Sequence, residues 1–244
     1  MAPTELTIPI FLDIIVHGFT HAYLLLFGVL FIFRGRKEDN TFLKGLGIGF
    51  ILLAISDFLA TYSRSFYLGL TLAELAADPG YVLLWRVLSI CDQFALFAIA
   101  YVVGAQTIER YIIPEKIPIF WILPAITVPN IILLFFIDPV SNWRFLPLLS
   151  TIIILLLIIV IYLRLALETE AEFRRMALAF AGGIFCIGWA RAFSGRTFMD
   201  IAATLVTIDE VIFELFANSL QLLSNLLFIL AVLLIAYSNL FRAD

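Results

Sequence analysis

Polar residues recur in the last hydrophobic segment of the chain at a spacing suited to a binding site. They are Glu210, Glu214, Asn218, Gln221 and Asn225. At about 100° per residue on a helix, they fall within an arc of about 80° and form one polar stripe. At membrane depth, carboxylates and amides normally face a bundle interior or a water-filled cavity, because lipid cannot satisfy them. The stripe therefore predicts a polar core or a site for ions or polar ligands.

The first hydrophobic segment contains both histidines of the protein, His17 and His21. Asp13 and Thr20 share a helical face with them. Histidines one helical turn apart can direct two ring nitrogens to one metal ion, and a carboxylate can complete the shell. Asp13, His17 and His21 are therefore a candidate metal site, and a metal ion is the cofactor that the sequence allows. A pair of core histidines hydrogen-bonded to carboxylates is the alternative.

Further charged residues lie inside the hydrophobic segments, where acids outnumber bases. The acids are Asp13, Asp57, Asp92, Glu210 and Glu214, and the bases are Arg86 and Arg191. Structural ion pairs, such as one between Asp57 and Arg86, would account for some of them. Carboxylates left over in a medium of low dielectric hold protons or bind a cation. The sequence thus favours a proton or cation role, and these residues, together with Asn218 and Gln221, form the candidate binding set.

Hydrophobic segments long enough to cross a bilayer must position these residues. Of the 244 residues, 63% are hydrophobic and 14% are charged, a composition far from that of soluble proteins. A spanning helix needs about 20 apolar residues, and this criterion predicts an all-α, integral membrane bundle of seven helices in one domain. The predicted helices cover residues 8–33, 41–64, 80–108, 117–137, 145–166, 174–194 and 208–240. We expect the fourth to be kinked or irregular, because prolines at three positions remove backbone donors.

The basic residues predict the orientation of the bundle. Most of them lie in the loops after the first, third and fifth segments and at the C-terminus. By the positive-inside rule, the N-terminus is outside and the C-terminus inside, so the candidate site lies in the outer half of the membrane. The first and last helices of a closed bundle are commonly neighbours. We therefore expect Glu210 and Glu214 to face His17 and His21, with Asp57 and Arg86 nearby.

Two parts of the chain match weakly at a constant offset of 132 residues. Arg64 and Phe66 then align with Arg196 and Phe198, and a serine between the first two aligns with a threonine. A duplication of this kind would give three helices, a linker helix and three more helices in the same orientation.

The seven-helix, three-plus-one-plus-three plan resembles the microbial-rhodopsin class of bundles and also small sugar transporters of the PQ-loop type. Residues 208–219, with Phe185 and Trp189, have an opsin-like pattern. The resemblance implies retinal bound to a lysine of the seventh helix, yet Asn218 and Gln221 stand where that lysine is expected. Covalent retinal is therefore not expected, and no proline-glutamine motif supports the sugar-transporter interpretation.

Three functions follow from these patterns. The first is an ion or solute transporter, the second is a sensor or receptor that signals through a protein partner, and the third is a non-catalytic subunit of a larger membrane complex. The lipid bilayer is the expected partner, and a protein partner or a homo-oligomer stays open. The net charge of −4 and the short loops argue against nucleic acid. We do not expect an enzyme, because the sequence has no Ser-His pair and no acidic metal motif.

Overall fold

The computed structural model describes residues 8–66, 72–103, 122–137, 145–194 and 210–240, and within these ranges the chain is helical with no strand. The helices are α1 (Ile8–Lys37), α2 (Thr41–Phe66), α3 (Leu72–Ala77), α4 (Pro79–Val103), α5 (Ile122–Leu134), α6 (Phe145–Glu168), α7 (Ala171–Ser194) and α9 (Glu210–Leu240). The all-α prediction is confirmed, and most predicted boundaries agree within a few residues. The short helix α3 was not predicted.

The described helices indicate a multi-pass membrane protein. Five stretches are long and apolar enough to cross a membrane, namely Ile15–Lys37, Thr41–Ser63, Pro79–Val103, Leu149–Glu168 and Phe173–Ala190. Apolar stretches of α5 and α9, Ala125–Leu134 and Leu222–Ser238, are shorter. The count of seven spans and the orientation in the membrane therefore stay predictions.

Helix α5 contains two of the three prolines of its predicted segment, and the expected kink stays a prediction. It begins at Ile122 and continues as a helix through Pro129. Pro124 lies in the first turn, where the backbone N–H would have no partner within the helix, so a proline is tolerated there. Pro118 lies outside the described residues.

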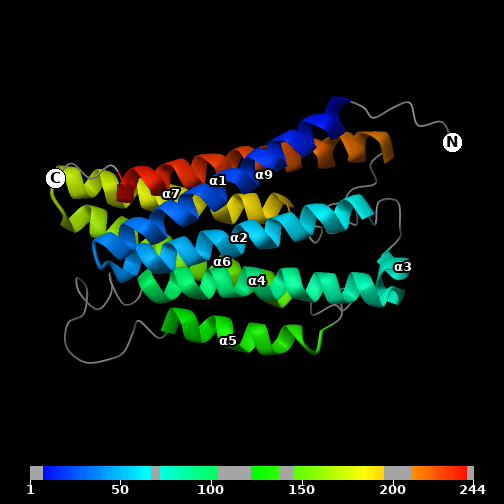
Figure 1. The fold of residues 1–244 in the computed structure, drawn as a ribbon, viewed down its shortest axis with the longest axis horizontal. Coiled ribbons are helices and arrows are strands. Elements are labelled where there is room, and N and C mark those ends of the chain that lie inside the picture. The colour runs from blue at the N-terminus through cyan, green and yellow to red at the C-terminus, as the bar shows by residue number, and fades with distance from the viewer. Residues whose placement is uncertain (1–7, 67–71, 104–121, 138–144, 195–209, 241–244) are drawn as a thin grey trace.

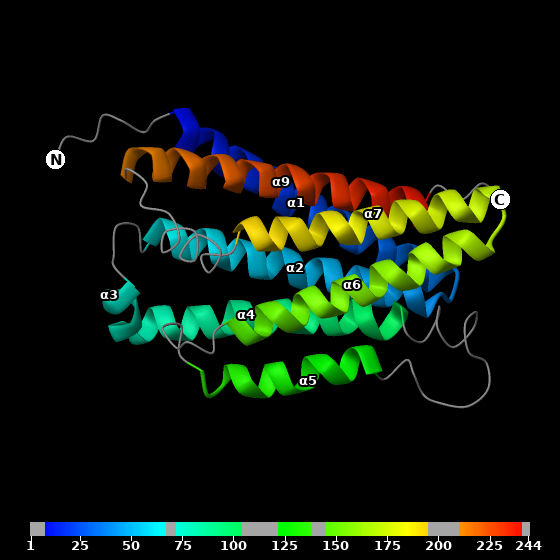
Figure 2. The ribbon, with the colours of Figure 1, turned by 180° about the vertical axis from the view of Figure 1, so that it is seen from behind.

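The long helices run up and down as a closed bundle (Figures 1 and 2). Each of α1, α2, α4, α5, α6, α7 and α9 packs against the next in this order, and α9 packs against α1. The first and last helices are therefore neighbours, as expected. They also run in the same direction, so their N-terminal ends lie at the same end of the bundle (Figure 1).

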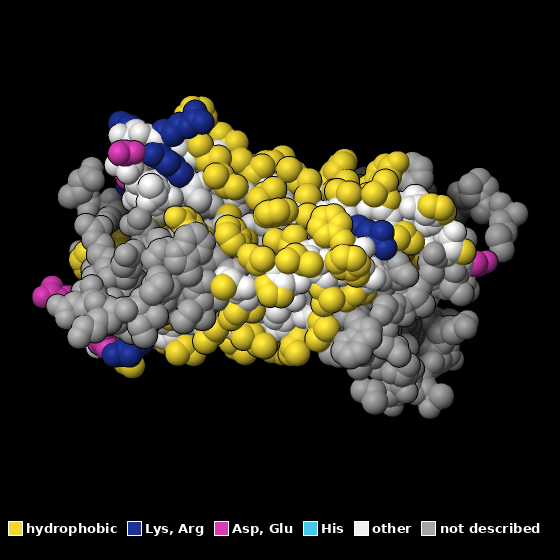
Figure 3. Space-filling view, turned by 90° about the horizontal axis from the view of Figure 1, so that it is seen from below, with side chains coloured by type: hydrophobic (Ala, Val, Ile, Leu, Met, Phe, Trp, Pro, Cys, Tyr) yellow, Lys and Arg dark blue, Asp and Glu magenta, His cyan; other side chains and the backbone are white. Residues whose placement is uncertain are grey.

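Hydrophobic and charged side chains occupy different parts of the surface along the bundle axis. Figure 3 shows hydrophobic side chains over the middle of one face, whereas most of the visible lysine, arginine and acidic side chains gather at one end. Bulky residues such as Phe19, Phe33, Leu83 and Phe136 are more than half exposed. Such a band fits the hydrocarbon core of a bilayer. The connections between α1 and α2 and between α6 and α7 lie together at one end, which we call the basic end; it includes Lys44.

The two halves of the bundle share one packing detail. A Cβ atom on Gly49 of α2 would lie 2.7 Å from Ile99 Cγ1 of α4, and one on Gly183 of α7 would lie 2.5 Å from Ile235 Cγ1 of α9. In each half, the helix that carries the glycine comes close to its neighbour, where it contacts an isoleucine side chain. It also contacts the backbone carbonyl of the alanine that precedes this isoleucine by one turn. The glycines are 134 residues apart and the isoleucines 136, so this equivalence does not follow the constant offset of 132, and the duplication stays a prediction.

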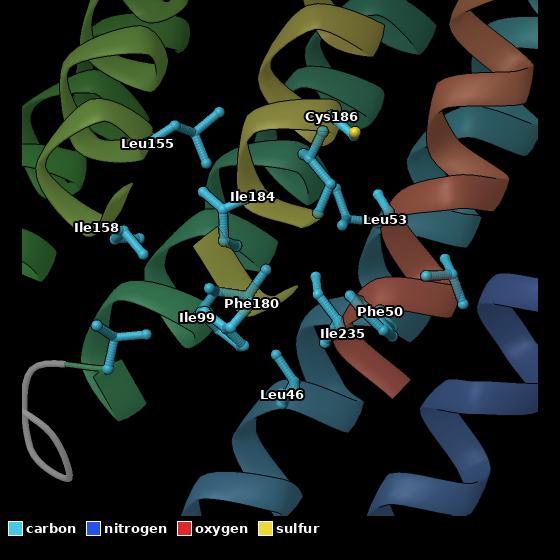
Figure 4. Packing of buried hydrophobic residues seen from close by; sticks show 14 of the residues in the cluster. Leu46, Phe50, Leu53, Ile99, Leu155, Ile158, Phe180, Ile184, Cys186 and Ile235 are labelled. Atoms are coloured by element: carbon cyan, nitrogen blue, oxygen red, sulfur yellow. The ribbon is translucent and has the colours of Figure 1, made fainter. Parts of the chain in front are cut away.

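Large apolar side chains pack together in the interior of the bundle (Figure 4). They include Phe31 of α1, Phe50 of α2, Ile99 of α4, Phe180 of α7 and Ile235 of α9, each at most 2% exposed. We call these residues the apolar layer. The rings of Phe31 and Phe50 lie 5.5 Å apart between centroids. The layer separates the polar residues described below from the basic end.

Candidate functional site

His21 reaches from α1 to a carboxylate on α2. Its Nε2 lies 3.0 Å from Asp57 Oδ2, and the two side chains are 13% and 7% exposed. Asp57 lies on the same face of α2 as Leu46, Phe50 and Leu53, which are all buried. This face of α2 points into the bundle, so a titratable pair replaces apolar packing in the interior.

His17 reaches from α1 in the other direction, to α9. Its Nδ1 lies 3.1 Å from Asn225 Nδ2, and the residues are 2% and 1% exposed. In this arrangement the amide donates to the imidazole. If the amide turns over, its oxygen can instead accept a hydrogen bond from a protonated Nδ1. Asn225 can therefore serve His17 in either protonation state.

The placement of α1 explains why the two histidines have different partners. The helix lies between α2 and α9, and positions one turn apart differ by about 40° around its axis. The ring centroids are 6.1 Å apart with an interplanar angle of 38°. Thr20, expected on the same face, donates its hydroxyl to Val16 O of its own helix at 2.8 Å.

The candidate metal site is only partly described. His21 Nε2 and His17 Nδ1 contact different neighbouring helices rather than one common point. Among the described side chains, no three from His, Cys, Asp and Glu are grouped so as to hold a metal ion. The side chain of Asp13 lies outside them, so the metal site stays a prediction.

The polar stripe of α9 contacts α1 closer to the basic end than expected. The contact with Asn225 makes this residue, rather than a glutamate, the position level with His17. Glu214 precedes it by eleven residues and so lies about 16 Å farther along the helix axis, and Glu210 about 22 Å. The expectation that the two glutamates face the histidines therefore stays a prediction. The side chains of Glu210, Glu214, Asn218, Gln221 and Arg191 lie outside the described residues.

Two candidate residues of α4 lie near the same level as the histidine sites. Ser56 Oγ donates to Leu88 O at 3.1 Å, which sets the register between α2 and α4. Arg86 is two residues from Leu88 and therefore lies close to the level of Asp57. Asp92 lies one turn beyond Leu88, toward the basic end, and both charged residues are partly buried.

Asp92 lines a cavity of about 20 Å³ in the middle of the bundle. Thr151 of α6, Leu53 of α2 and Ile187 of α7 contribute other parts of its wall. Gln93 Nε2 donates to Thr151 Oγ1 at 3.1 Å, so α4 and α6 are joined beside the cavity.

Sequence reasoning missed several buried polar contacts. Asn225 was recognised in the stripe but not as the partner of His17. Gln93 with Thr151, and Asn130 with Ser150, join helices through buried side chains. Their amide and hydroxyl groups inside apolar segments are a signal of interior positions, but the pairings depend on the register between helices.

Comparison of the chain with protein-family models, with curated proteins and with solved structures finds no match in any of the three. The resemblance to the rhodopsin class therefore stays a prediction about architecture.

Proposed function

We propose that this membrane protein binds a proton at His21 and Asp57 and uses it to drive transport of an ion or a small polar solute. The contact of 3.0 Å between His21 Nε2 and Asp57 Oδ2 inside the bundle carries this proposal. Histidine is the side chain that changes charge near neutral pH, and ionisable groups within membrane helices commonly mark ion and proton pathways.

The two groups come from different helices, so protonation acts on the packing between them. With the proton bound, an imidazolium faces a carboxylate, and α1 and α2 attract each other across the contact. Without it, the Asp57 carboxylate lies beside a neutral ring, and the attraction between the two side chains is weaker in this medium of low dielectric. Binding and release of one proton would therefore favour different arrangements of α1 against α2.

The apolar layer supplies the barrier that a transporter of this kind needs. Phe50 is seven residues from Asp57 on α2, about 10 Å along the axis toward the basic end. We propose that the layer keeps the site closed to that end in one state and opens in another. By the positive-inside rule, the basic end faces the cytoplasm in this proposal.

Proton flux into liposomes tests the function. We expect the purified protein to carry protons under an applied potential or solute gradient, and His21→Gln and Asp57→Asn to reduce this flux by about 100-fold or more, as loss of a proton-transferring group does. Asp39→Asn makes the same chemical change at an exposed residue of the basic end and should leave flux unchanged. Flux at the wild-type level in Asp57→Asn would overturn the proposal.

A sensor is the second candidate, and the closed apolar layer favours it. In this case protonation moves α1 against α2, and a protein partner binds preferentially to one of the two arrangements at the basic end. Spin labels at the exposed residues Arg36 and Arg175 would then change their separation with pH while the liposomes show no flux. A pH-dependent separation together with flux supports the transporter instead.

A further inference from the structure

The connection between α1 and α2 at the basic end carries four cations, and two of them are neutralised within it. Arg34 Nε lies 2.6 Å from Glu38 Oε1, and Lys44 Nζ lies 2.7 Å from Asp39 Oδ1. Asn40 Oδ1 accepts backbone hydrogen bonds of 3.0 and 3.3 Å from the first turn of α2, so the connection has a defined shape. These two ion pairs use both acids of the connection.

The two remaining cations, Arg36 and Lys37, are exposed at the end of α1. Within the described part of the chain, neither makes a hydrogen bond or an ion pair. They stand about 100° apart around the helix axis, and Phe33, which is 67% exposed, lies between them on the same face. Leu30 and Leu26 continue this face toward the middle of the bundle, and both are exposed. An exposed apolar stripe thus ends in two cations that no acid neutralises.

This face of α1 matches the two chemical parts of a phospholipid. Leu26 and Lys37 are about 16 Å apart along the helix axis, close to the half-thickness of about 15 Å of a bilayer's hydrocarbon core. The apolar stripe therefore has the length of one acyl chain, and the cations lie at the level of the headgroup. A lipid with net negative charge suits them better than phosphatidylcholine, whose own choline offsets the charge of its phosphate. In the orientation proposed above, the basic end faces the cytoplasmic leaflet, where anionic lipids are found.

We propose that Arg36 and Lys37 bind the headgroup phosphate of an anionic phospholipid, whose acyl chain lies along Phe33, Leu30 and Leu26. The bound molecule is a lipid of the surrounding bilayer, held by charge at one end and by apolar contact along the stripe. This lipid site is separate from the His21–Asp57 contact and does not depend on the proposed transport.

The connection between α6 and α7 lies at the same end and has a different charge balance. It carries three cations and three acids, so its formal charge is zero. Arg164 Nε lies 2.9 Å from Glu168 Oε1. Arg175 is exposed, but Glu170 and Glu172 belong to the same connection. This part of the basic end therefore offers no surplus of positive charge to a lipid phosphate.

Native mass spectrometry of the purified full-length protein tests the proposal with phosphatidylglycerol and phosphatidylcholine of equal chain length. We expect the wild type to bind phosphatidylglycerol at least about ten-fold more tightly, since each cation near the membrane surface attracts anionic lipid. The double variant Arg36→Gln/Lys37→Gln should bind the two lipids about equally. If this variant does not fold, as judged by its helical circular dichroism, the single variants Arg36→Gln and Lys37→Gln decide, and each should reduce the preference.

The double variant Arg164→Gln/Arg175→Gln is the matched control, because it removes the same charge from exposed positions at the same end. It should keep the wild-type preference for phosphatidylglycerol. An unchanged preference in Arg36→Gln/Lys37→Gln, or an equal loss in both double variants, would overturn the site. Displacement of phosphatidylglycerol by millimolar inorganic phosphate would show that the two cations bind free phosphate and would overturn the lipid as the occupant.

Discussion

His17 Nδ1 and Asn225 Nδ2 lie 3.1 Å apart although the two residues are 208 positions apart in the chain. Their contact joins the first helix to the last and closes the bundle at the level of its polar residues. On the other side of α1, His21 joins the same helix to α2. Helix α1 thus contacts α2 through His21 and α9 through His17. For this reason we assign α1 the central part in the proposed binding and release of a proton.

Replacing Asn225 by leucine should destabilise the bundle by about 1–3 kcal/mol, because the buried His17 nitrogen loses its hydrogen-bond partner. Thermal unfolding in detergent, followed by circular dichroism, measures the change. An unfolding midpoint of Asn225→Leu equal to that of the wild type would contradict the structural importance of the contact.

The His21–Asp57 contact should appear as a coupling energy. In a double-mutant cycle with His21→Gln and Asp57→Asn, we expect an interaction of about 0.5–3 kcal/mol, the range for residues in direct contact. Denaturant unfolding in mixed micelles measures the four variants. Strictly additive effects would mean that the two side chains do not interact in the folded protein.

Gly183 should be intolerant of a side chain. A Cβ atom there would lie 2.5 Å from Ile235 Cγ1 and 3.0 Å from Ala231 O, so Gly183→Ala must push α7 away from α9 and should cost about 1–3 kcal/mol. Gly18 makes a matched control, since a Cβ atom at that helical position meets nothing within 4 Å. Gly18→Ala should be neutral or stabilising by up to about 1 kcal/mol. Equal unfolding midpoints for the two variants would argue against the close approach of α7 and α9.

The turn between α1 and α2 contains a carboxylate whose pKa depends on a lysine. Lys44 Nζ lies 2.7 Å from Asp39 Oδ1, and its hydrogen bond and charge hold the pKa of Asp39 below the usual 3.8. Because this pKa is lowered in the folded protein, the stabilisation is present above the ordinary pKa and is lost as the pH falls through the lower, folded value. We expect Lys44→Gln to return the pKa toward 3.8, as measured by NMR titration of the carboxyl carbon. An unchanged midpoint in the variant would show that the pair does not persist in solution.

The sequence alone determined the helical elements with good accuracy. Apolar segments long enough to span a bilayer must form helices there, because every backbone polar group has to be satisfied within the segment. For a similar reason, the sequence predicts that Asp57, Asp92 and the histidines lie in the interior, because exposing such groups to lipid is costly. Among the described residues, the short helix α3 was not predicted by these rules.

The tertiary structure alone decided which polar groups meet. His17 contacts Asn225, and a shift of three turns between α1 and α9 would change every contact along the seam while leaving the pattern on each helix unchanged. Likewise, the cavity beside Asp92 depends on how Leu53, Thr151 and Ile187 from three other helices fill the centre. Periodicity specifies the face on which a residue lies, whereas the axial register between distant helices results from the packing of all their side chains together.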